Sequence, residues 1–136
     1  ICEEELKSLA IGRGSLGGEE LAEIRLHVSH TRNFLAKIPW GRSFRAIPEI
    51  AGAHHEKLDG SGYPFGLQAP EIPLPAKIMT IADIFDALTA NDRPYKRAIP
   101  VEGALDILLK EAASGKVDSE LVDVFIAGQL YRSVDI

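Results

Sequence analysis

The sequence predicts an all-α domain, a bundle in which several amphipathic helices pack together, and three observations support this prediction. Apolar residues recur at spacings of three and four in residues 19–38, 76–90, 101–113 and from residue 119 onward, which is the period of an α-helix. Proline or glycine stands at the ends of these segments, where helices begin or stop. No segment alternates apolar and polar residues as a half-buried β-strand would.

The composition is that of one globular domain. The chain has 136 residues, of which 46% are hydrophobic and 26% are charged, and its net charge is −5. An acidic balance argues against binding to a nucleic acid polymer, because such proteins usually carry a basic stripe. The single cysteine, Cys2, excludes an internal disulfide and indicates a reducing compartment, the cytoplasm. No apolar run approaches the roughly 18 residues that a membrane span needs.

Glycine at positions 12, 14, 17 and 18 divides the chain. Glycine at that density breaks a helix, so we expect residues 1–18 to be a flexible segment or join and residues 19–136 to be the helical domain. The chain begins with Ile1 instead of methionine, and we expect it to be part of a longer protein.

The first helix, residues 19–38, carries one histidine beside its apolar stripe. The stripe consists of Leu21, Ile24, Val28, Leu35 and Ile38. His27 lies at its inner edge, where a histidine is more often hydrogen-bonded in the core than bound to a metal. Both roles stay open for His27 at this point, whereas nothing supports a site role for His30.

Two adjacent histidines mark the end of a short second helix, expected from Pro48 to about Glu56. His54 and His55 can offer imidazole nitrogens to a divalent metal, and the glycines that follow let the backbone approach a ligand closely. The alternative is a solvated helix end. The turn-rich residues 60–75 then form a loop long enough to indicate function.

The third helix, residues 76–90, is apolar nearly all round, and we expect it to be central. Asp83 and Asp86 lie on one face of it, and a buried carboxylate is costly unless it is paired or bound to a metal. For Asp86 a salt bridge or cap is as plausible as a site role. Two further helices, residues 101–113 and one capped by Ser119, are expected to cover the central helix.

Residues 54–64, His-His-Glu-Lys-Leu-Asp-Gly-Ser-Gly-Tyr-Pro, resemble the signature of the HD-GYP family of metal-dependent phosphodiesterases, which are related to the wider HD phosphohydrolases. The likeness extends over about residues 15–131 and includes the helix around His27 and residues 72–78, 82–89 and 93–96. It implies an HD-domain-like helical bundle. It also implies that four side chains bind metal, namely His27, His54, His55 and Asp83. Glu56, next to the ligands, would orient an imidazole or equally be a solvated charge. Asp86 would lie beside the metal ligands without binding the metal itself.

The resemblance further implies a reaction and a substrate. Two or three divalent ions, iron or manganese, would polarise a phosphoryl oxygen and activate water, and the substrate would be a cyclic dinucleotide, cyclic di-GMP. Gly62, Tyr63 and Pro64 would line its site, and Arg93 and Lys96 would meet its phosphates, although Arg93 could instead face water. Two alternatives remain: a non-catalytic module that binds the nucleotide or docks a diguanylate cyclase domain, or an HD phosphohydrolase for another nucleotide.

One part of the family pattern is absent, because no histidine is followed directly by aspartate. We expect this pair upstream of Ile1 in the parent protein, so that the bundle is incomplete on its N-terminal side and this chain alone is inactive or nearly so. A bundle without all of its helices exposes apolar surface, which predicts self-association.

Overall fold

A computed structural model describes residues 18–90 and 98–132, and its regular structure is helical as predicted. An isolated bridge between Asp59 and Gln68 is present, and no strand occurs in these two ranges. The helices are α2 (Gly18–Leu35), α3 (Ile47–Ala53), α4 (Leu74–Thr89), α5 (Val101–Ala113) and α6 (Ser119–Ala127), with the 3-10 turns η1 (Ala69–Glu71) and η2 (Leu130–Arg132).

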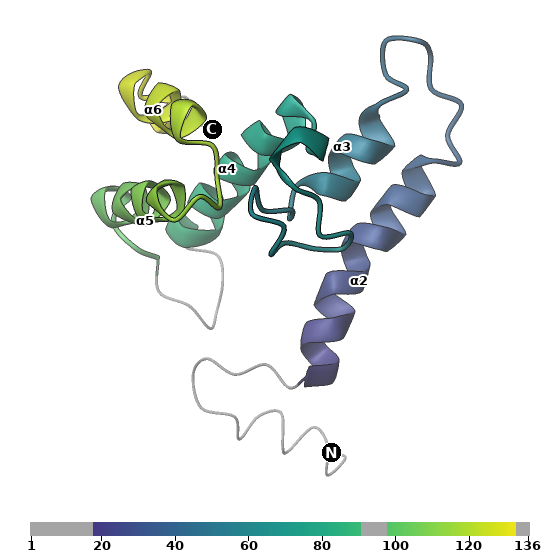
Figure 1. Ribbon diagram of the computed structural model, residues 1–136, viewed down its shortest axis with the longest axis horizontal. Helices are drawn as coiled ribbons and strands as arrows, with labels where there is room; N and C mark the ends of the chain where they lie inside the picture. Colours follow the sequence, from purple (N-terminus) through teal and green to yellow (C-terminus); the bar gives the residue numbers. More distant parts are fainter. Residues whose placement is uncertain (1–17, 91–97, 133–136) are drawn as a thin grey trace.

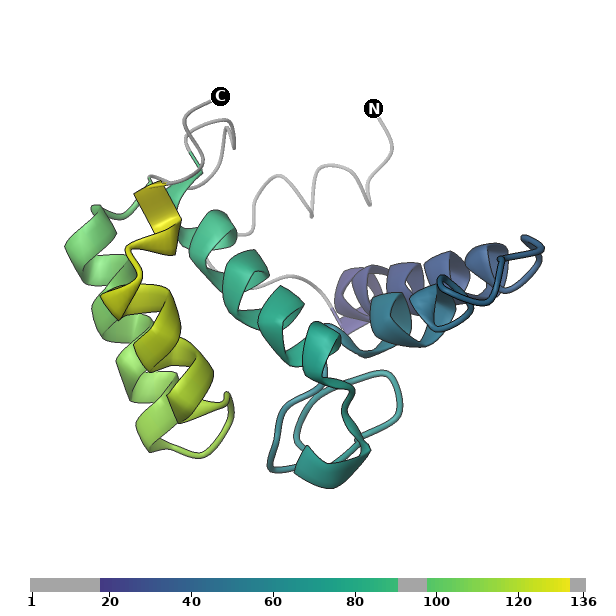
Figure 2. The same ribbon diagram turned by 90° about the horizontal axis from the view of Figure 1, so that it is seen from above.

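Helix α4 is central, as its apolar composition predicted. It runs between the pair α2 and α3 on one side and the pair α5 and α6 on the other (Figures 1 and 2). The loop between α3 and α4 lies beside the start of α4. The loop therefore packs near both the end of α3 and the beginning of α4.

Two apolar cores lie along α4 and fix its neighbours. Ile81 belongs to one core, together with Leu108 of α5 and Val122 of α6. Ala76 belongs to the other, together with Ala53 at the end of α3 and Ile72 of the loop. Because both cores include residues of α4, this helix sets the position of the end of α3, where the two adjacent histidines follow.

The stripe on α2 is covered only near its middle. Val28 is fully buried, whereas Ile24 is 43% exposed. Ile38, which is 36% exposed, lies beyond α2, because the helix ends at Leu35 and not at residue 38 as predicted. Helix α3 packs against α2 but has only seven residues, and it cannot cover a helix of 18 residues along its whole length. His27, next to Val28, is exposed on this helix.

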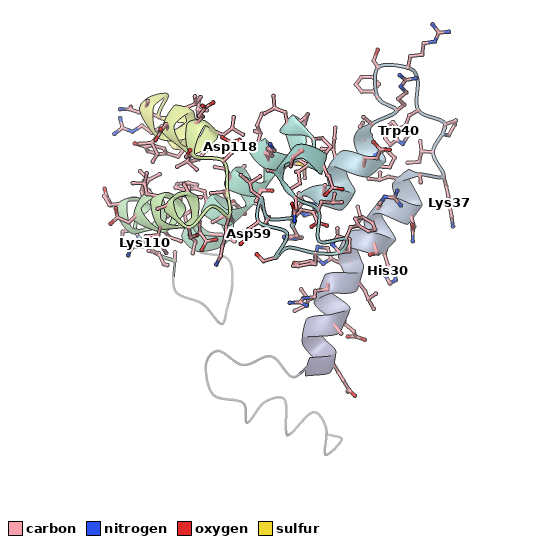
Figure 3. All side chains as sticks on the ribbon, viewed as in Figure 1. His30, Lys37, Trp40, Asp59, Lys110 and Asp118 are labelled. Atoms are coloured by element: carbon pink, nitrogen blue, oxygen red, sulfur yellow. The ribbon has the colours of Figure 1, made fainter. Side chains whose placement is uncertain are left out.

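The cap of α6 corrects one prediction. Asp118, not Ser119, is the N-cap residue, and its carboxylate accepts the backbone N–H of Leu121 at 3.2 Å (Figure 3). Asp118 has an extended backbone and Ser119 is already helical, so only the aspartate can turn its side chain back onto the free N–H groups of the first turn.

The division of the chain at residue 18 stays a prediction, since residues 1–17 lie outside the described ranges. Within the described residues, no helix combines the length and the apolar character that crossing a membrane requires.

Candidate metal centre

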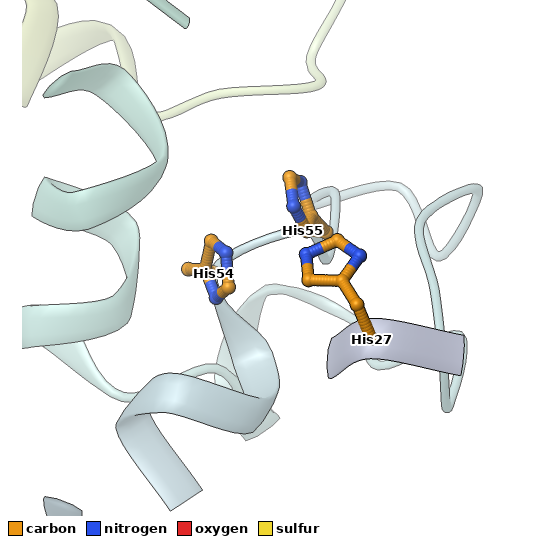
Figure 4. Close-up of side chains that lie close together, drawn as sticks. All are labelled: His27, His54 and His55. Carbon is orange, nitrogen blue, oxygen red and sulfur yellow. The ribbon is translucent and has the colours of Figure 1, made fainter. Parts of the chain in front are cut away.

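Three imidazoles converge from α2 and from the end of α3 (Figure 4). The ring centroids of His54 and His55 are 4.1 Å apart, and the ring of His27 lies 5.4 Å from that of His55 and 6.4 Å from that of His54. One potential ligand atom of each histidine lies within 4.8 Å of those of the other two. The structure thus brings together three of the four side chains predicted to bind metal.

Helical geometry orients two of these rings. Nδ1 of His27 is hydrogen-bonded to the carbonyl of Ile24, and Nδ1 of His54 is hydrogen-bonded to the carbonyl of Ala51 at 2.7 Å. A carbonyl oxygen only accepts, so each Nδ1 carries the proton and each Nε2 keeps its lone pair. A backbone carbonyl behind the ring is the usual way in which proteins orient a metal-binding histidine.

Asp83 reaches the same place from α4. Its Oδ2 lies 3.8 Å from Nδ1 of His55, and its side chain is 47% exposed. Burial, followed by the neighbouring His54 ring, lowers the pKa of His55 to about 4, and Asp83 offsets only part of this shift. His55 is therefore neutral at pH 7. The contact joins a neutral imidazole to a carboxylate, and these are the forms in which both groups bind metal ions.

The donor types suit a divalent ion, and one of the spacings does as well. Two ligand atoms that each lie about 2.1 Å from one ion are at most about 4.2 Å apart. The 3.8 Å between His55 and Asp83 meets this limit, whereas the 4.8 Å that bounds the group of three imidazoles, which does not include Asp83, is longer than it. Imidazole and carboxylate together suit first-row transition metals.

Glu56 braces the loop that follows the histidines. Its side chain is buried, with 2% of the residue exposed, and its two carboxylate oxygens accept the backbone N–H groups of Phe65 at 2.7 Å and of Leu67 at 2.9 Å. Neither sequence interpretation, an imidazole partner or a solvated charge, describes these contacts. The carboxylate is held by amides nine and eleven residues further along the chain.

Gly62, Tyr63 and Pro64 pack directly on this segment. A Cβ at Gly62 would lie 2.3 Å from the backbone nitrogen of Lys57, so only glycine allows this approach. The N–H of Tyr63 donates to the carbonyl of His55 at 3.3 Å, and the Tyr63 ring stacks on the His55 ring at 4.9 Å and 19°. The Tyr63–Pro64 peptide bond is cis. Tyr63 thus packs against His55, while the predicted contact of Gly62, Tyr63 and Pro64 with a substrate stays a prediction.

Two residues that the sequence analysis did not identify, Thr80 and Arg25, contact residues of the candidate site. The hydroxyl of Thr80, which is buried, donates to the carbonyl of His54 at 2.7 Å and also lies 2.9 Å from that of Ala76. The guanidinium carbon of Arg25 lies 5.3 Å from the centre of the Tyr63 ring. A polar residue within an apolar helix could have indicated Thr80, whereas nothing local distinguishes Arg25 from a solvated arginine.

The remaining predicted residues are not brought into the cluster. Asp86 is exposed on α4, and within the described residues its carboxylate makes no hydrogen bond or ion pair. His30 is exposed on α2 (Figure 3), which agrees with its having no predicted site role. Arg93 and Lys96 lie outside the described residues.

Comparison with known proteins gives one family. A model of the HD domain family matches residues 4–121. The 3'3'-cGAMP-specific phosphodiesterase 1 of Vibrio cholerae is 41% identical over 124 residues, which are 90% of this chain and 28% of the relative. The 3'3'-cGAMP-specific phosphodiesterase 3 of the same organism is 45% identical over 95 residues, 70% of this chain and 20% of the relative. The cyclic di-GMP phosphodiesterase of Thermotoga maritima is 48% identical over 79 residues, 57% of this chain and 21% of the relative.

These matches confirm the family likeness expected from residues 54–64. The chain spans less than a third of the length of each of these relatives.

Proposed function

Because the chain belongs to the HD domain family, we propose that it forms the metal-binding part of a phosphodiesterase that hydrolyses a cyclic dinucleotide. One observation carries the proposal: His27, His54 and His55 converge from separate parts of the chain, with Asp83 beside them. The relatives, which are named as phosphodiesterases of cyclic di-GMP or 3'3'-cGAMP, support the substrate class.

In this proposal His27, His54, His55 and Asp83 hold divalent metal, iron or manganese. Bound ions of this kind polarise a phosphoryl oxygen and lower the pKa of water. The protein's own part is to orient the ligands: backbone carbonyls fix the rings of His27 and His54, and Tyr63 supports the ring of His55. Four side chains suffice for one ion, so a second or third ion needs ligands beyond these.

The substrate site lies along the loop of Gly62, Tyr63 and Pro64, with cyclic di-GMP as the expected ligand. Because two of the relatives are named for 3'3'-cGAMP, this nucleotide must be tested as a substrate beside cyclic di-GMP. Both substrates contain two phosphodiester groups, and the metal centre would act on one of them. Arg93 and Lys96 remain proposed phosphate contacts.

Metal retention tests the ligand set. The purified chain, reconstituted with manganese or iron, is expected to keep stoichiometric metal by elemental analysis, and His54→Ala and Asp83→Ala are expected to lose most of it. His30→Ala is the matched control, because His30 is an exposed histidine of α2 without a site contact. Full metal content in both site variants would refute the proposed centre.

Turnover tests the reaction. Hydrolysis of cyclic di-GMP and of 3'3'-cGAMP is measured for this chain and for a version extended upstream of Ile1. We expect little or no turnover by the chain alone and restored turnover by the extended protein, with loss of activity in Asp83→Ala. Full activity of the chain alone would contradict the need for further ligands, and no activity of the metal-loaded extended protein on either nucleotide would contradict the reaction.

A docking module is the second candidate, and the exposure of Phe65 favours it. This ring follows the Gly-Tyr-Pro segment directly and is 55% exposed. A diguanylate cyclase domain would be the partner. A docking module needs no stoichiometric metal, so Asp83→Ala would leave its partner binding unchanged, whereas Phe65→Ala would weaken it.

A further inference from the structure

We propose that Arg25 is a substrate-binding residue that contacts a phosphodiester group at the metal centre. This inference rests on the proposed function and adds to it one residue that would bind the phosphate of the substrate. It concerns a side chain of α2 that lies two positions before His27.

Arg25 is connected to the candidate metal centre through Tyr63, which contacts both Arg25 and His55. Its guanidinium carbon lies 5.3 Å from the centre of the Tyr63 ring. That ring stacks on the imidazole of His55 with 4.9 Å between centres. Arg25 thus contacts the ring that stacks on a candidate metal ligand.

Arg25 has no ionic partner among the residues that the structure describes. The residue is exposed, and no carboxylate of the described residues lies within 4.0 Å of its guanidinium. Arg32 of the same helix makes a similar contact, 5.4 Å above the Phe65 ring, but it lines a cavity that also contains the carboxylates of Glu49 and Glu71. Of these two arginines, only Arg25 lies over the ring that stacks on His55.

The chemistry of the guanidinium suits a phosphodiester. Its planar fork of N–H donors can meet two phosphate oxygens at once, and it can do so while it stays stacked on an aromatic ring. Stacking on Tyr63 restricts the long side chain before the ligand arrives, which reduces the entropy that binding must supply. In a chain with a net charge of −5, such a local cation is what would draw an anionic substrate to this site.

Binding measurements test the inference without depending on turnover. The probes are bis(4-nitrophenyl) phosphate, which is a minimal phosphodiester, cyclic di-GMP and 3'3'-cGAMP, each titrated into the manganese-loaded chain by calorimetry. Arg25→Ala is expected to weaken the binding of all three about ten- to hundredfold, the range of a charge-assisted hydrogen bond, and Arg25→Lys is expected to retain part of the affinity. Arg42→Ala, which removes the same charge from the connection between α2 and α3, is the control and should bind as the wild type does.

The dependence of affinity on salt separates a phosphate contact from support of Tyr63. A direct charge contact is screened by ions, so Arg25→Ala should make the dissociation constant less sensitive to salt while its metal content stays the same. Unchanged affinity in Arg25→Ala, or weaker affinity with an unchanged salt dependence, overturns the inference.

The same titrations distinguish failure of the proposed function from failure of the proposed role of Arg25. If the wild type binds the small diester in an Arg25-dependent way but neither cyclic di-GMP nor 3'3'-cGAMP, the substrate class is wrong and the role of Arg25 holds. If the metal-loaded wild type binds none of the three, both proposals fall.

Discussion

Glu56 and Gly62 support the candidate metal centre through backbone contacts. The Glu56 carboxylate takes up two N–H groups of the loop, and the missing side chain of Gly62 lets the loop lie against the backbone of residues 56 and 57. Both residues adjoin the pair formed by His55 and Tyr63. The stacking of Tyr63 on His55 therefore depends on contacts that involve no metal ligand directly.

Replacing Glu56 by glutamine tests this bracing. One amide oxygen can still accept an N–H, but the NH2 group then faces the N–H of Phe65 or Leu67, which leaves a buried donor unsatisfied. We expect Glu56→Gln to lower the free energy of unfolding by about 1–3 kcal/mol, measured in urea. Hydrogen exchange at the amides of Phe65 and Leu67 should become faster.

Glu71→Gln is the matched control for this variant. Glu71 is an exposed glutamate of the same loop whose carboxylate accepts a single backbone N–H, that of Gln68, at 2.9 Å. Its substitution should cost clearly less, because water can replace the lost acceptor. Equal losses in the two variants would mean that burial of the Glu56 carboxylate contributes little.

The sequence indicated candidate ligands but not the residues that support them. His54, His55 and Asp83 were proposed as ligands because of the resemblance to the HD-GYP family, since the residue types alone left a solvated helix end open for the two histidines. The contacts of Glu56 could not be predicted, since they depend on where residues 65 and 67 return in space. Arg25 was missed for the same reason: its partner, Tyr63, lies 38 residues away.

At the scale of elements, Thr80 connects α4 to the end of α3. Its hydroxyl donates to the carbonyl of His54, which lies just beyond the last residue of α3. The bond fixes the backbone of one candidate ligand to the helix that carries Asp83. Through this bond, the end of α3 follows a movement of α4, which helps to keep the distance between the imidazoles and the carboxylate.

Thr80→Val removes this bond and keeps the shape of the side chain. We expect a loss of about 1–2 kcal/mol in the free energy of unfolding, because a buried carbonyl loses its donor, and weaker binding of manganese. Thr89→Val on the same helix is the control, since the Thr89 hydroxyl bonds only the carbonyl of Phe85 within α4. Equal manganese affinity in the two variants would show that the link between α3 and α4 does not position the ligands.

Helical periodicity predicted the elements but not what covers them. Residues 101–113 form α5 with the predicted bounds, and residue 115, a glycine expected past its end, has a φ of +75°, which glycine adopts without strain. The stripe on α2 was equally regular, yet Ile24 is 43% exposed. A period of 3.6 residues identifies the apolar face of a helix, and the partner of that face depends on the rest of the fold.

For the whole molecule, α4 presents an uncovered apolar stripe. Leu74 is 57% exposed and Ile78 is 51% exposed, and Ala82, the next residue at a spacing of four, is also exposed. Residues four apart lie on one face of a helix. Ile81, three residues after Ile78, is instead buried in the core that α4 forms with α5 and α6.

We expect this stripe to make the chain self-associate, with a second copy of the same chain as the partner, because contiguous exposed apolar surface is unfavourable in water. The weight-average mass in sedimentation experiments should rise with concentration, and Ile78→Glu should suppress the rise with little effect on the free energy of unfolding. Val124→Glu is the control, since Val124 is 60% exposed on α6 and lies outside the stripe. A mass that stays monomeric at high concentration would contradict the prediction, and equal suppression by both variants would place the contact elsewhere than on α4.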